Sequence, residues 1–198
     1  LGVTLWNLQG RLVCSSIPPR PGAPAPAPHQ KSFEEALAVD DLYLSNVFPG
    51  PITGLQLVTF GFPVKDDAGV KVGLLSIPVR SEYLERQLLD LHRLPGSVAG
   101  IIDRDFKLVA RIPAMQEWQG KSVAMVPGFA TGLKSPEGAF ESSSLDDVRR
   151  VFAHKLVPRA GWQVYVAVED EVLYAGFRRQ LFQGLIAFAA VIAFSLTL

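Results

Sequence analysis

Apolar and polar positions alternate in short runs along much of the chain, a pattern typical of β-hairpins. Residues 5–16 predict two strands around a polar turn, and residues 101–113 predict a second hairpin of the same kind. Residues 54–64 and 70–79 predict a third hairpin, and three more strands are expected between residues 139 and 169. The pattern therefore predicts antiparallel sheet as the main component of the fold.

Two segments have the apolar spacing of amphipathic helices. Residues 32–47 begin with Ser32, a candidate N-cap, and residues 80–96 end at a Pro-Gly pair. Residues 113–138 are predicted to form a loop with short helical pieces. Residues 15–31 are rich in proline and alanine, which predicts an extended loop inside a domain, with a linker between domains as the alternative.

The two similar hairpins indicate an internal repeat. When Leu5 is aligned with Ile101, 96 residues later, an apolar strand, a turn amide or acid, a basic residue and a second apolar strand all fall into register. The alternative is that any two hairpins look alike. We predict a first module at residues 1–94, a second module at residues 95–169, and a helical segment at residues 170–198.

The two ends of the chain give further expectations. Residues 181–198 contain no charged side chain and are apolar enough to predict a membrane-spanning helix in contact with the lipid bilayer. A buried C-terminal core helix is the alternative. Because the chain begins with Leu1 inside a strand-like run, we also expect it to be a piece of a longer protein.

Composition supports a folded domain and gives no case for nucleic acid as a partner. Hydrophobic residues make up 48% of the 198 residues, and the 19 basic residues balance the 19 acidic ones without a basic stripe. The single cysteine, Cys14, excludes an intrachain disulfide and is expected to be a small buried apolar residue.

The order of the motifs carries a family resemblance. The chain resembles the double Cache domain, the tandem PAS-like sensor found outside the membrane in bacterial histidine kinases, diguanylate cyclases and chemoreceptors. The motifs that carry it are LWNLQGRLVCSS, FGFPVKDDAGVKVGLLSIPV, GIIDRDFKLVARIP and GAFESSSLDDVRRVFAHKLVPRAGWQVYVAV, followed by the apolar run. The resemblance implies an α+β fold of two tandem modules with antiparallel sheets and a C-terminal transmembrane helix.

The chain also departs from the family pattern. The turns at residues 105–106 and 146–147 lack the usual glycine, so we expect these turns to be built differently. Pro78 stands where family members that bind amino acids or amines carry an aspartate. We therefore do not infer amine recognition for this chain from the resemblance, and the identity of the ligand stays open.

No catalytic or metal-binding pattern is present in the sequence. The three histidines are far apart, and the motifs of zinc sites, nucleophile elbows and nucleotide-binding loops do not occur. No cofactor is expected, and neither is a catalytic residue. A membrane-anchored enzyme would need a cluster of titratable groups that the sequence does not offer.

A binding pocket remains, which in a PAS-like module lies between the sheet and the helical insert. The first module has the longer insert, so we place the pocket there. The aromatic and hydroxyl candidates for its walls are Trp6, Tyr43, Thr59, Phe60 and Ser76. Strand alternation cannot put Thr59 and Phe60 on one face, and Trp6 and Phe60 are alternatively plain core residues.

Charged side chains are given structural roles instead. Arg80 and Arg111 have the charge to hold a carboxylate, but a surface or snorkelling role is favoured. Asp103, Arg104 and Asp105 are interpreted as turn residues, because Asn7, Leu8 and Gln9 stand at the same places in the first copy.

These observations predict a non-catalytic sensor. We expect residues 1 to about 175 to be periplasmic, to bind a small organic ligand, and to pass the ligand state through a C-terminal helix of the inner membrane to a cytoplasmic output domain. A homodimer is expected for the parent receptor, and the resemblance implies a histidine kinase, a diguanylate cyclase or a chemoreceptor as that receptor. The alternative is a structural or dimerising module without a ligand.

Overall fold

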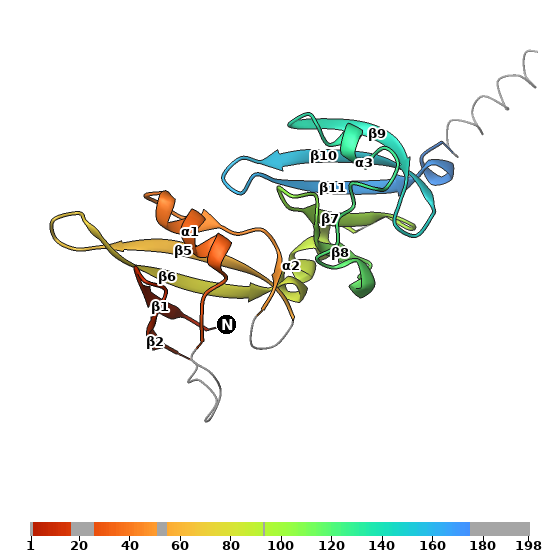
Figure 1. Ribbon diagram of the computed structural model, residues 1–198. Helices are drawn as coiled ribbons and strands as arrows, with labels where there is room; N and C mark the ends of the chain where they lie inside the picture. Colours follow the sequence, from red (N-terminus) through yellow and green to blue (C-terminus); the bar gives the residue numbers. More distant parts are fainter. Residues whose placement is uncertain (1, 17–25, 51–54, 93, 175–198) are drawn as a thin grey trace, which may run out of the picture.

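Two antiparallel sheets form the molecule, and a short helix lies between them (Figure 1). The computed structural model describes residues 2–16, 26–50, 55–92 and 94–174. The predicted α+β class with tandem antiparallel sheets is confirmed. The predicted C-terminal span, residues 181–198, lies outside the described residues. Within the described ranges, no helix is long and apolar enough to cross a membrane.

The first sheet has the order β2-β1-β6-β5-β3, with β4 paired separately to β5. Its strands are β1 (Thr4–Asn7), β2 (Leu12–Ser15), β3 (Tyr43–Leu44), β4 (Phe48–Pro49), β5 (Gln56–Lys65) and β6 (Lys71–Arg80). The long β5–β6 hairpin was predicted from the sequence and is confirmed. This sheet is followed by helix α2 (Ser81–Leu88) and the 3₁₀ helix η1 (Leu89–Leu91).

Helix α1 (Gln30–Ala38) lies on one face of the first sheet and is shorter than predicted. The prediction of one helix over residues 32–47 was wrong. The side chain of His29, not that of Ser32, caps the helix, and it accepts a hydrogen bond from the backbone N–H of Ser32. Tyr43 and Leu44 instead pair with β5, because their apolar side chains fit an edge strand as well as a helix face.

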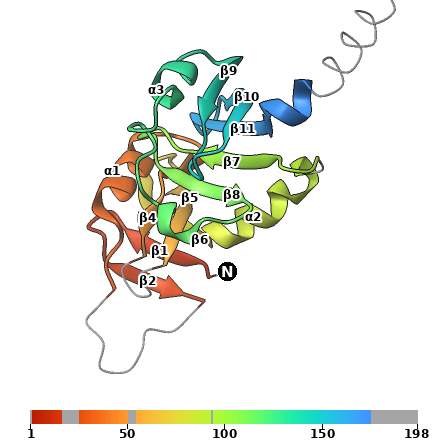
Figure 2. The same ribbon diagram turned by 90° about the vertical axis from the view of Figure 1, so that its right-hand side faces the viewer.

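The second sheet has the order β8-β7-β11-β10-β9. Its strands are β7 (Val98–Ile102), β8 (Leu108–Ile112), β9 (Glu137–Ser143), β10 (Arg149–Val157) and β11 (Trp162–Glu169). The connection from β8 to β9 contains η2 (Gln116–Trp118) and α3 (Phe129–Gly132), as the predicted loop with short helical pieces requires. Figure 2 shows this connection and both sheets after a quarter turn.

The two sheets repeat one topology. Strands β2, β1, β6, β5 and β3 take the places of β8, β7, β11, β10 and β9, so the repeated order of elements is confirmed. The predicted register also holds, because Leu5 pairs with Cys14 as Ile101 pairs with Ala110. Both hairpins contain a register shift at the next residue, Trp6 or Ile102. The module boundaries at residues 94 and 169 stay a prediction.

The turns that lack glycine are nevertheless built like those that contain it. The Asn7 side chain accepts hydrogen bonds from the backbone N–H groups two and four residues later, and the Asp103 side chain does the same. Gly10 has φ +70°, and its counterpart Phe106 has φ +57°. Asp147 also has a left-handed φ, of +58°. Our expectation of a different turn geometry was therefore wrong.

Two apolar clusters hold the second sheet in place. One cluster joins the modules: Val58 and Val79 of the first sheet pack with Leu88 of α2 and with Ile101 and Trp162 of the second sheet. The other cluster fills the opposite face of the second sheet, under the η2–α3 connection. Aromatic side chains dominate it, namely Phe129, Phe140, Phe152 and Tyr165. Each face of the second sheet is thus packed.

Candidate functional site

The register of the first sheet decides which predicted site residues share a face. Trp6 pairs with Leu74, Ser76 pairs with Gly61, and Gly61 also pairs with Tyr43. Paired residues lie on the same face and alternate residues return to it. Trp6, Tyr43 and Ser76 therefore lie on one face, which we call the α1 face because helix α1 covers it. Thr59 joins them, two residues before Gly61 on the same strand.

Phe60 lies on the opposite face. It pairs with Ile77 and Leu44, and all three pack against the apolar cluster between the modules. The sequence argument that Thr59 and Phe60 cannot share a face is confirmed. Because Phe60 is screened from the α1 face by the sheet itself, the structure does not bring it together with the other four residues.

Helix α1 packs tightly over the two aromatic residues of the α1 face. Phe33 and Ala36 of the helix form a cluster with Trp6 and Tyr43, which are only 7% and 8% exposed. The approach is close because a Cβ at Gly61 would lie 3.0 Å from that of Ala36. Both aromatic side chains thus belong to a packed core, while Thr59 and Ser76, further along the strands, are half-buried.

A chain of polar contacts starts from the Tyr43 hydroxyl. The hydroxyl donates a hydrogen bond to the Glu35 carboxylate of α1 and accepts one from Arg104 Nη2 at 3.1 Å. The Arg104 guanidinium also lies 5.3 Å from the centre of the Tyr43 ring. Burial and the bond to Glu35 raise the pKa of Tyr43 to about 12, although the charge of Arg104 acts the other way. The hydroxyl is therefore neutral at physiological pH.

Asp103 is the most buried carboxylate of this region, with 4% of the residue exposed. Burial raises the pKa of Asp103 above its usual value, against the opposing effect of hydrogen bonds from the N–H groups of Lys107, Val47 and Asp105. The bond from the Val47 N–H, at 3.0 Å, connects the second module to the first. Asp103 is a turn residue, as predicted, and it also binds across the modules.

Sequence reasoning missed Glu35 and Arg104 as parts of this network. Their contacts join residues far apart in the chain, so no local pattern marks them. The repeat itself contains one clue. Leu8 occupies the place of Arg104 in the first copy and is 43% exposed, so the arginine is not needed to build the turn.

A buried ionic cluster in the second module corrects one expectation. Arg111 was predicted to have a surface role, but its side chain is only 2% exposed. Arg111 Nη2 donates to Asp146 Oδ2 at 3.0 Å, and the other Asp146 oxygen accepts from Arg150, which is also buried. Arg80, in contrast, is exposed and lies 3.6 Å from Glu82. One carboxylate thus accepts hydrogen bonds from two buried guanidinium groups.

One smaller expectation also changes. Cys14 is exposed, although a buried thiol was expected. His154 is 6% exposed and its Nδ1 lies 3.1 Å from Gln163 Oε1, so it is a buried sheet residue. In the described ranges, no group of three or more His, Cys, Asp or Glu side chains could hold a metal ion.

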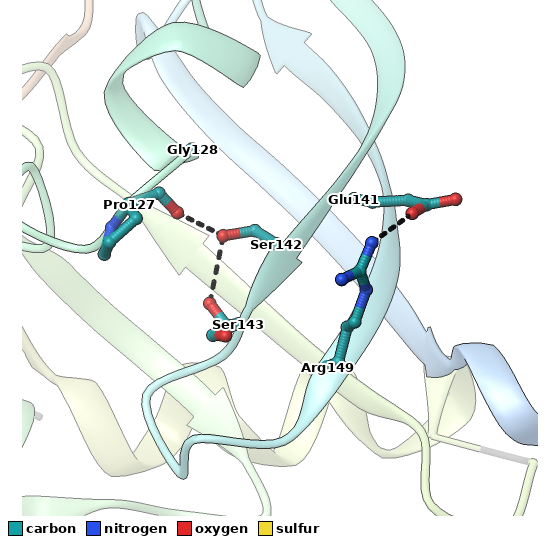
Figure 3. A pocket seen from close by; sticks show the side chains of 6 residues that line it. All are labelled: Pro127, Gly128, Glu141, Ser142, Ser143 and Arg149. Carbon is teal, nitrogen blue, oxygen red and sulfur yellow. Dashed lines mark hydrogen bonds and ion pairs between the residues drawn. The ribbon is translucent and has the colours of Figure 1, made fainter.

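One cavity among the described residues lies in the second module (Figure 3). It has a volume of about 230 Å³ and is lined by Pro127, Gly128, Glu141, Ser142, Ser143 and Arg149. Arg149 Nη2 lies 3.0 Å from Glu141 Oε2 on one side of it, and Ser142 donates to the Pro127 carbonyl on the other. A cavity for a drug-sized ligand is usually larger than about 300 Å³ and mostly apolar, so this shallow polar site fits that use poorly.

Comparison with known proteins identifies the fold. No family model matches the chain, and no curated protein matches it. Among solved structures, the extracellular domain of rpHK1S-Z16, assigned as a histidine kinase, superposes with a TM-score of 0.71 at 24% identity, over 86% of this chain and 71% of that one. The similarity is therefore one of structure.

Ligand-binding domains of chemoreceptors have the same fold. The domain of the Pseudomonas aeruginosa amino acid chemoreceptor PctB, in complex with L-Gln, gives a TM-score of 0.67 at 16% identity over 94% of this chain and 75% of that one. The domain of the Pseudomonas fluorescens chemoreceptor CtaA, in complex with L-isoleucine, gives 0.63 at 17% identity over 88% and 71%. The chain has the fold of such extracellular sensor domains, consistent with the Cache resemblance.

Proposed function

We propose that this chain is the extracytoplasmic small-molecule sensing domain of a bacterial transmembrane signalling receptor. The observation that carries the proposal is the likeness of both modules together, over 86% of the chain, to the extracellular domain of a sensor protein. The proposal places residues 1 to about 175 outside the inner membrane and residues 181–198 in it. In the parent receptor the domain acts as a homodimer.

The proposed ligand site is the α1 face of the first module. Thr59 and Ser76 supply half-buried hydroxyls there, and Trp6 and Tyr43 supply the aromatic wall under α1. Phe60 lies behind the sheet and is left out of the proposed site. A ligand of a few heavy atoms can bind next to the hydroxyls if helix α1 shifts, which gives the two states that a sensor needs.

The proposed output runs through the second module to the C-terminal helix. Strand β11 ends at Glu169, and the helix that follows begins at Asp170 without a connecting loop. A ligand changes the balance between two arrangements only when it binds one of them more tightly. The bound state would then move this helix relative to its copy in the dimer and so control the cytoplasmic domain.

Ligand binding is tested by thermal-shift screening of the purified chain against a metabolite panel. The panel begins with L-amino acids, because the complexes of PctB and CtaA contain them. At a concentration of 100 times Kd, a ligand stabilises the folded state by about 2.7 kcal/mol, which raises Tm by several degrees. Ser76→Ala should reduce the shift for the same ligand. Ser143→Ala, the same change on an exposed strand of the second module, should leave it unchanged.

The alternative function is a structural or dimerising module without a ligand. The burial of Trp6 and Tyr43 under α1 favours it, because a filled first-module core needs no ligand. Analytical ultracentrifugation separates the two functions when it is combined with the panel. A stable dimer with no response to any compound supports the structural module, whereas a saturable response that Ser76→Ala weakens supports the sensor.

A further inference from the structure

The first turn of the second module binds one segment of the first module. Arg104, in this turn, donates three hydrogen bonds to the segment that connects α1 to β5. Its acceptors are the Asn46 side chain at 2.9 Å, the Leu44 carbonyl at 2.9 Å and the Tyr43 hydroxyl at 3.1 Å. The Arg104 side chain thus forms hydrogen bonds with three neighbouring residues of the other module.

Neighbours of Arg104 strengthen the contact. The buried Asp103 carboxylate accepts from the Val47 N–H at 3.0 Å, and Asp105 lies 3.4 Å from the Lys31 ammonium of α1. The exposed pair contributes little, but a carboxylate bonded to a buried N–H holds the two backbones in one register. The turn therefore touches both helix α1 and the segment that follows it.

Tyr43 connects this contact to helix α1. Its hydroxyl has one proton, which it donates to Glu35, so the same oxygen is free to accept from Arg104. A movement of α1 would displace the Glu35 carboxylate, so the hydroxyl would reorient and its bond with Arg104 would weaken. The equivalent residue of the first copy, Leu8, has no charged group with which to make such a bond.

We propose that the contact chain Glu35–Tyr43–Arg104 transmits the position of α1 to the second module. The proposal deepens the proposed sensing function by naming the route between the modules. The proposal rests on the sensing function only for the claim that a ligand is what moves α1. Because its test contains no ligand, failure of the coupling and failure of ligand binding are distinguishable.

The first experiment changes a residue of α1 and measures the contact of Asp103 and Arg104 with the first module. Glu35→Gln removes the charge that orients the Tyr43 hydroxyl. Hydrogen exchange of the Val47 amide, followed by NMR in the full-length chain, should become about fivefold faster, and the Nε signal of Arg104 should shift. Glu34→Gln, the same change one residue earlier, is the matched control. Glu34 is exposed, and its hydrogen bond within the described residues is to Gln30 of the same helix, so both signals should stay as in the wild type.

The second experiment runs in the opposite direction, because energetic coupling between two sites is reciprocal. Arg104→Leu installs the residue of the first copy and should accelerate exchange of the Leu37 amide in α1 by a similar factor. If Glu35→Gln does not fold, Tyr43→Phe keeps the ring and removes only the hydroxyl, and it should have the same effect on Val47. The proposal is overturned if these variants change the exchange rates of the Val47 and Leu37 amides no more than Glu34→Gln does.

Discussion

Asp146 holds two buried cations in the second module, which gives a quantitative prediction for its removal. The side chains of Arg111 and Arg150 are 2% and 5% exposed, and each donates to a different oxygen of the Asp146 carboxylate. Asp146→Asn keeps the size of the side chain but removes its charge. One oxygen is then left to accept a hydrogen bond, and the amide nitrogen faces a guanidinium group.

The expected cost follows from this arrangement. Removing one partner of a buried ion pair costs about 3–5 kcal/mol, because the remaining charge is left uncompensated. Here the Asp146 side chain is 32% exposed, so water replaces part of the lost interaction. Other contacts of the arginines persist. Arg111 donates to the Pro113 carbonyl, Arg150 donates to the Gly96 carbonyl, and Arg150 Nη2 lies 3.6 Å from Glu169 Oε1. We therefore expect a loss of about 3 kcal/mol in the free energy of unfolding.

Urea unfolding followed by circular dichroism measures this loss. With an m-value of about 2 kcal/mol/M, the unfolding midpoint should fall by about 1.5 M urea without a change in m. Asp147→Asn is the matched control, because Asp147 is exposed and asparagine tolerates its left-handed φ. Midpoints of the two variants that agree within 0.3 M would refute the assignment of Asp146 as a shared partner.

Three further predictions concern single positions. Asp147→Gly should raise the free energy of unfolding by about 1 kcal/mol in urea titrations, because glycine adopts a φ of +58° without strain; a loss of stability would contradict this. Gly100→Ala should lower it by about 2 kcal/mol or more, since the new Cβ would lie 2.5 Å from the Tyr165 ring. Asp103 should titrate above pH 3.8 in carboxyl NMR spectra, because burial raises its pKa. The folded state then binds this proton more tightly than the unfolded state, so this group destabilises the fold above its folded pKa, and the penalty disappears as pH falls below 3.8. A midpoint at or below 3.8 would show that the backbone hydrogen bonds outweigh burial.

The sequence predicted the repeated hairpins well because their information is local. Asn7 and Asp103 each build a turn with their own side chain, and the apolar residues on both sides alternate with the period of a strand. The left-handed Phe106 was missed because the rule for turns expects glycine there. Its ring packs against the second-module core, and this contact offsets the backbone strain.

The remaining features depend on partners that are distant in sequence. Tyr43 fits a helix face or an edge strand equally well, and pairing with Gly61 of β5 decides between them. Arg104 looked like a turn residue, which it is, but its three bonds reach residues about 60 positions earlier. Arg111 is buried because other parts of the chain cover its face of the sheet, and no sequence pattern in β8 indicates that they do.

The central claim is that a small molecule binds on the α1 face of the first module. The most direct measurement is an NMR titration of the full-length chain, in mild detergent, with the compound that gives the largest thermal shift. The account predicts saturable shifts centred on Thr59, Ser76 and helix α1. Shifts confined to the cavity between Pro127 and Arg149, or no saturable shift with any compound of the panel, would contradict it.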